Sequence, residues 1–190
     1  MGRASESTKL HEFFLTLARK SFNELGVGDE TVVGYVAGLL TEFARSDRLY
    51  PLRDPNGKAI DSVVEAQIEA ARSQPNQQTL AHAREFRKYL GDYTLFMSGL
   101  FRTHVERTGV LDYYFEEGRR SYWAVSELDL SLYRTGFFFF QQLSKNFEYY
   151  SGALDYMRKA YFAPAPGGVS PFAEFLRQVE GWMTTGLSEN

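Results

Sequence analysis

Cysteine is absent from this sequence of 190 residues, which excludes disulfide bonds, thiolate nucleophiles and zinc sites built on cysteine. No apolar run reaches the roughly 18 residues that a membrane-spanning helix needs. The segment Met1–Phe14 lacks the apolar centre of a signal peptide. The formal net charge is −3, whereas binding of nucleic-acid phosphates needs clustered Lys and Arg. From these absences we expect a cytoplasmic protein that binds neither nucleic acid nor a membrane.

Aromatic residues, by contrast, are abundant: the chain has 16 Phe and 12 Tyr, and aromatic residues make up 16% of it. Rings in this number indicate either a large buried core or pockets and interfaces lined by flat side chains. The length of the chain fits one domain with a sizeable core. We therefore expect residues 1–190 to form a single helical domain with an irregular loop at about 47–61. The residues that flank the turn in this loop could pair as a short hairpin.

Apolar residues recur every three or four positions along most of the chain, which is the period of an amphipathic helix. Gly26 and Gly109 are placed to end helices, Asp29 to cap the second helix, and Pro75 to close the third. The sequence therefore predicts an all-α, single-domain bundle of about six to seven helices. Their expected spans are about 8–25, 29–46, 62–72, 77–107, 112–125, 126–162 and 170–183.

The long central helix, at about 77–107, contains the stretch Tyr89–Phe101, which is almost entirely apolar or small. Gly91 and Gly99 lie on a thin face of this helix, beside a continuous apolar stripe. Asp92 is the one carboxylate in the stretch. We therefore expect the neighbouring helices to pack against this central helix.

The Phe-rich helix at about 126–162 would be a rod roughly 55 Å long, which exceeds the diameter of about 35–40 Å expected for a compact domain of this length. A break is therefore needed, and we expect a kink at Ser151-Gly152. Phe138 falls on the polar face of this helix. Its position indicates a contact between protomers or a ring that covers a pocket.

Two interpretations of Asp92 follow from its apolar surroundings, because a buried carboxylate must be paired or hydrogen-bonded. In the first, a bond from Lys88 or from the hydroxyl of Tyr89 or Tyr93 fixes the helix register. In the second, Asp92 forms the polar floor of an aromatic ligand pocket shared by the fourth, fifth and sixth helices. The candidate ligand-binding residues are then Asp92, Tyr93, His104, Tyr122, Trp123, Phe138 and Tyr150.

Catalytic and metal-binding patterns are missing. The di-iron motif of helical bundles needs Glu-x-x-His pairs, but Thr8, Thr79 and Phe101 stand three positions before the three histidines. Ser98-Gly99 lacks the preceding glycine of a nucleophile elbow. We therefore predict no metal site and name no catalytic residue.

Short segments loosely resemble haem oxygenases: Thr8–His11, Ala81-His82-Ala83 and Tyr89–Asp92. In that family an early helix supplies a proximal histidine, and a glycine-bearing helix lies over the distal face of the haem. The resemblance implies that His11 would be the axial ligand, with Gly91 and Asp92 on the distal helix.

The function that we expect is that of a non-enzymatic module that binds a small apolar or aromatic ligand or a protein partner, without a cofactor and as a homo-oligomer. The alternative is a haem- or metal-dependent oxidoreductase on a helical bundle.

Overall fold

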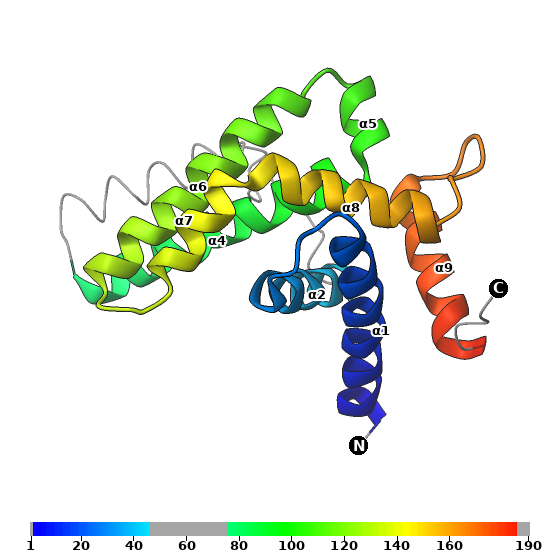
Figure 1. The fold of residues 1–190 in the computed structure, drawn as a ribbon, viewed down its shortest axis with the longest axis horizontal. Coiled ribbons are helices and arrows are strands. Elements are labelled where there is room, and N and C mark those ends of the chain that lie inside the picture. Colours follow the sequence, from blue (N-terminus) through cyan, green and yellow to red (C-terminus); the bar gives the residue numbers. More distant parts are fainter. Residues whose placement is uncertain (1, 46–75, 186–190) are drawn as a thin grey trace. The chain divides into compact units, whose positions relative to one another are not determined.

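The structure is a computed structural model that describes residues 2–45 and 76–185. These residues form helices and no strands, which confirms the predicted all-α fold (Figure 1). The expected third helix at 62–72 and the irregular loop at 47–61 lie outside the described residues. The helices are α1 (Gly2–Glu24), α2 (Glu30–Ala44), α4 (Gln77–Leu100), α5 (Arg102–Arg107), α6 (Leu111–Ser131), α7 (Phe137–Lys145), α8 (Phe147–Tyr161) and α9 (Pro171–Thr185).

The chain divides into two compact units. Of the described residues, unit 1 contains 2–45, 96–110 and 151–185, and unit 2 contains 76–95 and 111–150. Each unit is described by itself below. The expectation that residues 1–190 form one domain stays a prediction.

Unit 1 begins with α1 and α2, which are joined by the turn that the sequence predicts. The N–H of Gly26 bonds to the carbonyl of Asn23, and the N–H of Val27 bonds to that of Phe22. Gly26 itself has φ +77°. This is the Schellman ending, in which a left-handed residue follows the last turn. The side chain of Asp29 then accepts from the N–H of Thr31 and caps α2, as expected.

The core of unit 1 also uses the C-terminal end of α4 and most of α8. A Cβ atom on Gly99 would lie 2.5 Å from Cβ of Leu154, so only glycine permits this approach of the two helices. Beside it, the hydroxyl of Ser151 donates to that of Ser98 over 2.9 Å, and both side chains are fully buried. The predicted thin face of the central helix is therefore a real packing surface at Gly99.

Unit 2 packs α6 and α7 with the N-terminal part of α4 and the start of α8. Gly91 of α4 faces the ring of Tyr122 on α6, where an added Cβ would lie 2.6 Å from Cε1. Gly118 of α6 faces Phe147 in the same way, at 2.1 Å from Cζ. Both rings are fully buried, so two glycines of this unit provide space for large aromatic side chains.

The predicted helix at 126–162 is divided into three pieces. Helix α6 continues to Ser131, α7 covers 137–145, and α8 begins at Phe147. The length argument for a break is thus correct, and the breaks lie at 132–136 and at 146, whereas Ser151-Gly152, the position predicted for the kink, lies inside α8. The central helix also ends earlier than predicted, at Leu100, with α5 beginning at Arg102.

Tyr133 explains the end of α6. Its N–H bonds to the carbonyl of Leu130, and the N–H of Arg134 bonds to that of Asp129. This is again a Schellman ending, but its left-handed position holds Tyr133 (φ +56°) instead of glycine. A side chain in that conformation costs roughly 1–2 kcal/mol. Burial of the side chain does not compensate for this cost, since Tyr133 is 93% exposed.

We expect Tyr133→Gly to stabilise the protein, because glycine adopts the left-handed conformation without strain and the exposed ring has little packing to lose. After the extra chain entropy of glycine is subtracted, the free energy of unfolding should rise by about 0.5–1 kcal/mol, and Tm by a few degrees. Tyr133→Ala is the control, since it removes the ring but keeps the Cβ atom. Equal melting temperatures for the two variants would contradict a strained backbone at this position.

Candidate functional site

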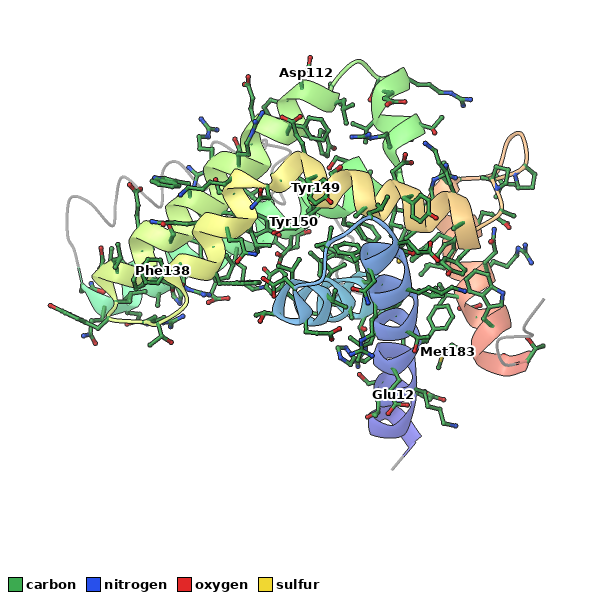
Figure 2. The ribbon with its side chains drawn as sticks, in the orientation of Figure 1. Glu12, Asp112, Phe138, Tyr149, Tyr150 and Met183 are labelled. Atoms are coloured by element: carbon green, nitrogen blue, oxygen red, sulfur yellow. The ribbon has the colours of Figure 1, made fainter. Side chains whose placement is uncertain are left out.

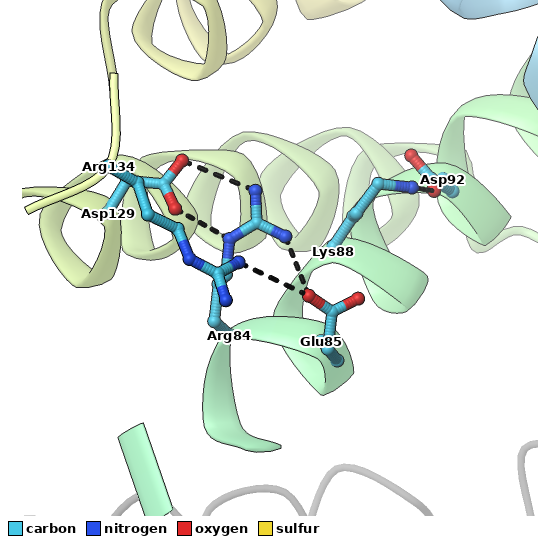
Figure 3. Close-up of polar contacts among 6 residues, drawn as sticks. All are labelled: Arg84, Glu85, Lys88, Asp92, Asp129 and Arg134. Carbon is cyan, nitrogen blue, oxygen red and sulfur yellow. Dashed lines mark hydrogen bonds and ion pairs between the residues drawn. The ribbon is translucent and has the colours of Figure 1, made fainter. Parts of the chain in front are cut away.

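Asp92 is buried in unit 2, with 5% of its surface exposed, and both of its oxygens are bonded. Lys88 Nζ donates to Oδ2 over 2.6 Å (Figure 3), and the hydroxyl of Tyr122 donates to Oδ1 over 2.8 Å. Lys88 is the partner that the sequence predicts. The tyrosine hydroxyl comes from Tyr122 on α6, which the sequence did not predict as a partner. That this bond between helices fixes the register of α4 against α6 stays a prediction.

Two further carboxylates of α6 are buried in unit 2, and sequence analysis missed both. Asp129 accepts from Nε and Nη2 of Arg84 over 2.6 and 3.3 Å (Figure 3). Glu117 accepts from Arg87 over 2.9 Å and also from Arg120. Because each of these carboxylates has a cation within bonding distance, this part of unit 2 is a paired structural network. Asp92, Glu117 and Asp129 are each paired within the unit.

The candidate ligand residues from the sequence are divided between the two units. Five of the six principal candidates are in unit 2 and His104 is in unit 1. Tyr122 bonds to Asp92, as described, and Tyr150 is buried and accepts from Gln142 over 3.2 Å. Figure 2 shows Phe138 on α7, where 71% of its surface is exposed. Asp92 and Tyr122 are thus the pair that the structure brings into direct contact.

Tyr93 and Trp123 have separate surroundings. Tyr93 packs with two other tyrosines, Tyr89 and Tyr114, at ring-centroid distances of 6.2 and 6.3 Å. Burial is the main cause that raises the pKa of Tyr93, and the neighbouring Tyr114 adds to the shift. Trp123 is 41% exposed, and its ring N–H donates to Glu127 on the same helix.

The haem-like arrangement finds little support in the structure. Gly91 packs against the Tyr122 ring, so this face of α4 has no room for a flat macrocycle. Asp92 is bonded on both oxygens. His11 lines a shallow groove with Ser7 and Thr8. Within residues 2–45 and 76–185, no group of three His, Asp or Glu side chains could hold a metal ion. None of the helices described is long and apolar enough to cross a membrane.

A cleft in unit 1 is the better candidate for a functional site. Its volume is about 240 Å³. It lies where the end of α4, α5, the end of α8, the following loop and the start of α9 meet, so its residues come from three separate stretches of the chain. The lining residues are Leu100, Phe101, Thr103, His104, Arg107, Arg158, Phe162, Ala163, Pro164, Ala165, Pro171 and Phe175.

Three phenylalanine rings form the buried part of the cleft. Phe101, Phe162 and Phe175 are each less than 8% exposed. The ring of Phe175 lies 5.9 Å from that of Phe101 and 5.1 Å from that of Phe162, between ring centroids. Because these rings also pack into the core of the unit, the apolar floor is rigid and is formed in the absence of a ligand.

The open side of the cleft is polar and basic. Helix α5 contributes Thr103, His104 and Arg107, which are exposed, and α8 contributes Arg158, which is partly buried. None of the described residues that line the cleft is acidic. His104 is a candidate from the sequence, and the structure does place it at a cavity, although with different neighbours from those expected.

Gln178 of α9 holds the loop wall of the cleft in place. Its side-chain oxygen accepts from the N–H of Ala163 over 2.9 Å, and its side-chain nitrogen donates to the carbonyl of Ala163 over 3.1 Å. The same nitrogen donates to Glu174 over 2.7 Å. Glu174 also accepts from Arg177 over 2.6 and 2.9 Å. Arg177, followed by Gln178, lowers the pKa of Glu174 to about 2.

We expect Asp92→Ala to lower Tm by several degrees. The substitution leaves the buried hydroxyl of Tyr122 and the ammonium of Lys88 without their acceptor, at a cost of about 1–3 kcal/mol. Glu116→Ala, at an exposed position of α6, is the matched control and should change the free energy of unfolding by less than about 0.5 kcal/mol. Unchanged stability of Asp92→Ala would rule out the register role and favour the ligand-pocket interpretation.

The ion pair of Glu174 predicts a pH-dependent contribution to stability. A carboxyl group with a pKa of about 2 in the folded chain and an ordinary value of 4.5 stabilises the fold above pH 4.5, and this stabilisation is lost as the pH falls to about 2. Glu174→Gln keeps an acceptor for Gln178 but removes the charge. It should melt below wild type at pH 7, and the difference should shrink between pH 4.5 and 2. A difference that stays constant down to pH 2 would contradict this role. Glu106→Gln, at an exposed position of α5, is the control for removal of a surface charge.

Comparison with known proteins gives no relative: no family model, no curated protein and no solved structure matches this chain.

Proposed function

We propose that this chain is a non-enzymatic binding protein and that the cleft in unit 1 holds a small, largely apolar ligand. The observation that supports this proposal is the floor of three buried phenylalanine rings, Phe101, Phe162 and Phe175, at the bottom of a cavity of about 240 Å³. Ligand sites are usually concave and mostly apolar, with a few polar groups that set the orientation of the ligand. The polar groups here are at the opening of the cleft.

The physical basis of such binding is the transfer of apolar surface from water to the ring floor. Each Å² of apolar surface that is buried contributes about 25 cal/mol. The rings are already packed, and Gln178 already holds the wall at Ala163. Few side chains therefore have to become ordered when a ligand binds. A larger part of the free energy of burying apolar surface then contributes to affinity.

The alternative function is a haem- or metal-dependent oxidoreductase. It is less well supported, because Tyr122 fills the space beside Gly91 that a distal helix would offer to a haem. A visible absorption spectrum and metal analysis of the purified protein distinguish the two functions. A Soret band that is lost in His11→Ala would favour the oxidoreductase.

Self-association as a homo-oligomer in the cytoplasm remains part of the proposal. Two aromatic residues of unit 2 support it, since Tyr133 is 93% exposed and Phe138 is 71% exposed, and exposed rings are common at protein interfaces. Light scattering that shows a strict monomer at high protein concentration would count against it.

We expect the uncharged dye N-phenyl-1-naphthylamine to bind in the cleft with increased fluorescence and a Kd in the micromolar range. Ala165→Trp should weaken binding by roughly tenfold or more, because Ala165 lines the cleft and an indole would fill it. Ala160→Trp is the matched control, since Ala160 is an exposed residue of α8 and does not line the cleft; this variant should bind the dye as wild type does. Absence of dye binding, or equal binding by both variants, would refute the proposed site.

A further inference from the structure

We propose that the ligand of this cleft is a carboxylate with an apolar ring or branched body, and that the guanidinium of Arg158 binds its carboxyl group. This inference rests on the proposed function, and it adds the chemical class of the ligand and the residue that recognises it.

Arg158 lines the cleft and is a partly buried arginine with an unbonded nitrogen atom. Its side chain is 21% exposed, and its Nε atom is buried and forms no hydrogen bond. The nearest carboxylate oxygen is Oδ1 of Asp155, at 3.6 Å from Nε, which is too long for a hydrogen bond. The other oxygen of Asp155 accepts from Lys159 over 2.5 Å. Lys159 therefore compensates the charge of Asp155. The guanidinium of Arg158 still has an N–H donor, at Nε, that makes no hydrogen bond.

Two other arginines show how a guanidinium binds an acid in this chain. Arg84 bonds to Asp129 through Nε and Nη2, and Arg177 bonds to Glu174 through the same pair of atoms. A planar guanidinium binds a carboxylate best in this two-bond geometry. Arg158 lacks this two-bond contact, since its ion pair with Asp155 is a single approach of 3.6 Å, and a carboxylate in the cleft would supply it.

The charges around the cleft favour an anion. On α5, His104 and Arg107 line the opening, while Glu106 is exposed and does not line it. On α9, the charge of Glu174 is taken by Arg177. Arg107 is exposed and is placed to add a second positive charge at the opening. An acid in the cleft would thus meet basic groups from both α5 and α8.

The floor of the cleft specifies the rest of the ligand. Beneath these basic groups lie Phe101, Phe162 and Phe175, which cannot solvate a second charge or a row of hydroxyls. A cavity of about 240 Å³ suits a body of one or two rings. A monocarboxylate of this kind places its charge at the basic opening and its body on the rings.

The test compares 2-naphthoate with uncharged 2-naphthamide, which has nearly the same shape, by calorimetry on the full chain. Wild type should bind naphthoate at least about tenfold more tightly than naphthamide, and added salt should reduce this preference. Arg158→Met should abolish the preference but keep the binding of naphthamide, and Arg107→Met should reduce it in part. Arg119→Met is the control, because Arg119 is an exposed residue of α6 that pairs with Glu148 over 2.9 Å; it should keep the full preference.

The outcomes separate this inference from the proposed function. Equal, salt-independent binding of the two compounds by wild type would overturn the carboxylate inference and leave an apolar site. Loss of preference in Arg119→Met, or its retention in a folded Arg158→Met, would also overturn it. Failure of the neutral dye and of both naphthalene compounds to bind would refute the proposed function itself. If Arg158→Met does not fold, the ratio of the two affinities in wild type and its salt dependence decide the question.

Discussion

The pairing of buried carboxylates is the constraint on which both units depend. In the part of the chain that the structure describes, five carboxylates are buried: Asp92, Glu117, Asp129, Asp155 and Glu174. Each has a cation within ion-pair distance. Removal of the cation from such a pair destabilises the fold, because an uncompensated carboxylate is left in the interior. Substitutions at the partner positions should therefore lower the stability of the fold.

Four of these five carboxylates have a partner three or four positions away on their own helix, namely Lys88, Arg120, Lys159 and Arg177. Such pairs can form within a single helix before the helices meet. Asp129 instead takes Arg84 from α4. Bonds between helices, such as this one and that of Tyr122 to Asp92, then select one register from those that the apolar stripes would allow. At the cleft, Lys159 forms the hydrogen-bonded ion pair with Asp155, and Arg158 approaches the other oxygen of Asp155 at 3.6 Å without a hydrogen bond.

The fold class and several helix ends could be predicted from the sequence because they depend on local chemistry. Gly26 and Gly109 both take positive φ at helix ends, and Asp29 caps α2. The end of α6 could not be predicted, because the left-handed position is held by Tyr133 and carries no glycine signal. Lys88 was predictable as a partner of Asp92 from its spacing. Tyr122 was not, because a bond between two helices depends on a register that no local pattern encodes.

The candidate site was harder to predict for the same reason. The residues that line the cleft come from about 100–107, 158–165 and 171–175, and no spacing in the sequence relates these stretches. The weak signal was a proline-rich loop with Phe162 before it and Phe172 after it. Sequence analysis selected aromatic residues near Asp92 instead. Those aromatic side chains belong to unit 2, where Tyr122 is packed against glycine and Tyr150 is bonded to Gln142.

The two bonds of Gln178 to Ala163 have a consequence for how the chain could vary. They hold the end of the α8 segment directly to α9, so the residues from Pro166 to Ser170 do not have to set that distance. A loop whose ends are held elsewhere accepts extra residues at small cost, since doubling its length adds only about 0.6 kcal/mol of closure entropy. Insertions at Gly167-Gly168 should therefore leave the floor and wall of the cleft unchanged. That turn is a suitable attachment point for a reporter group close to the opening.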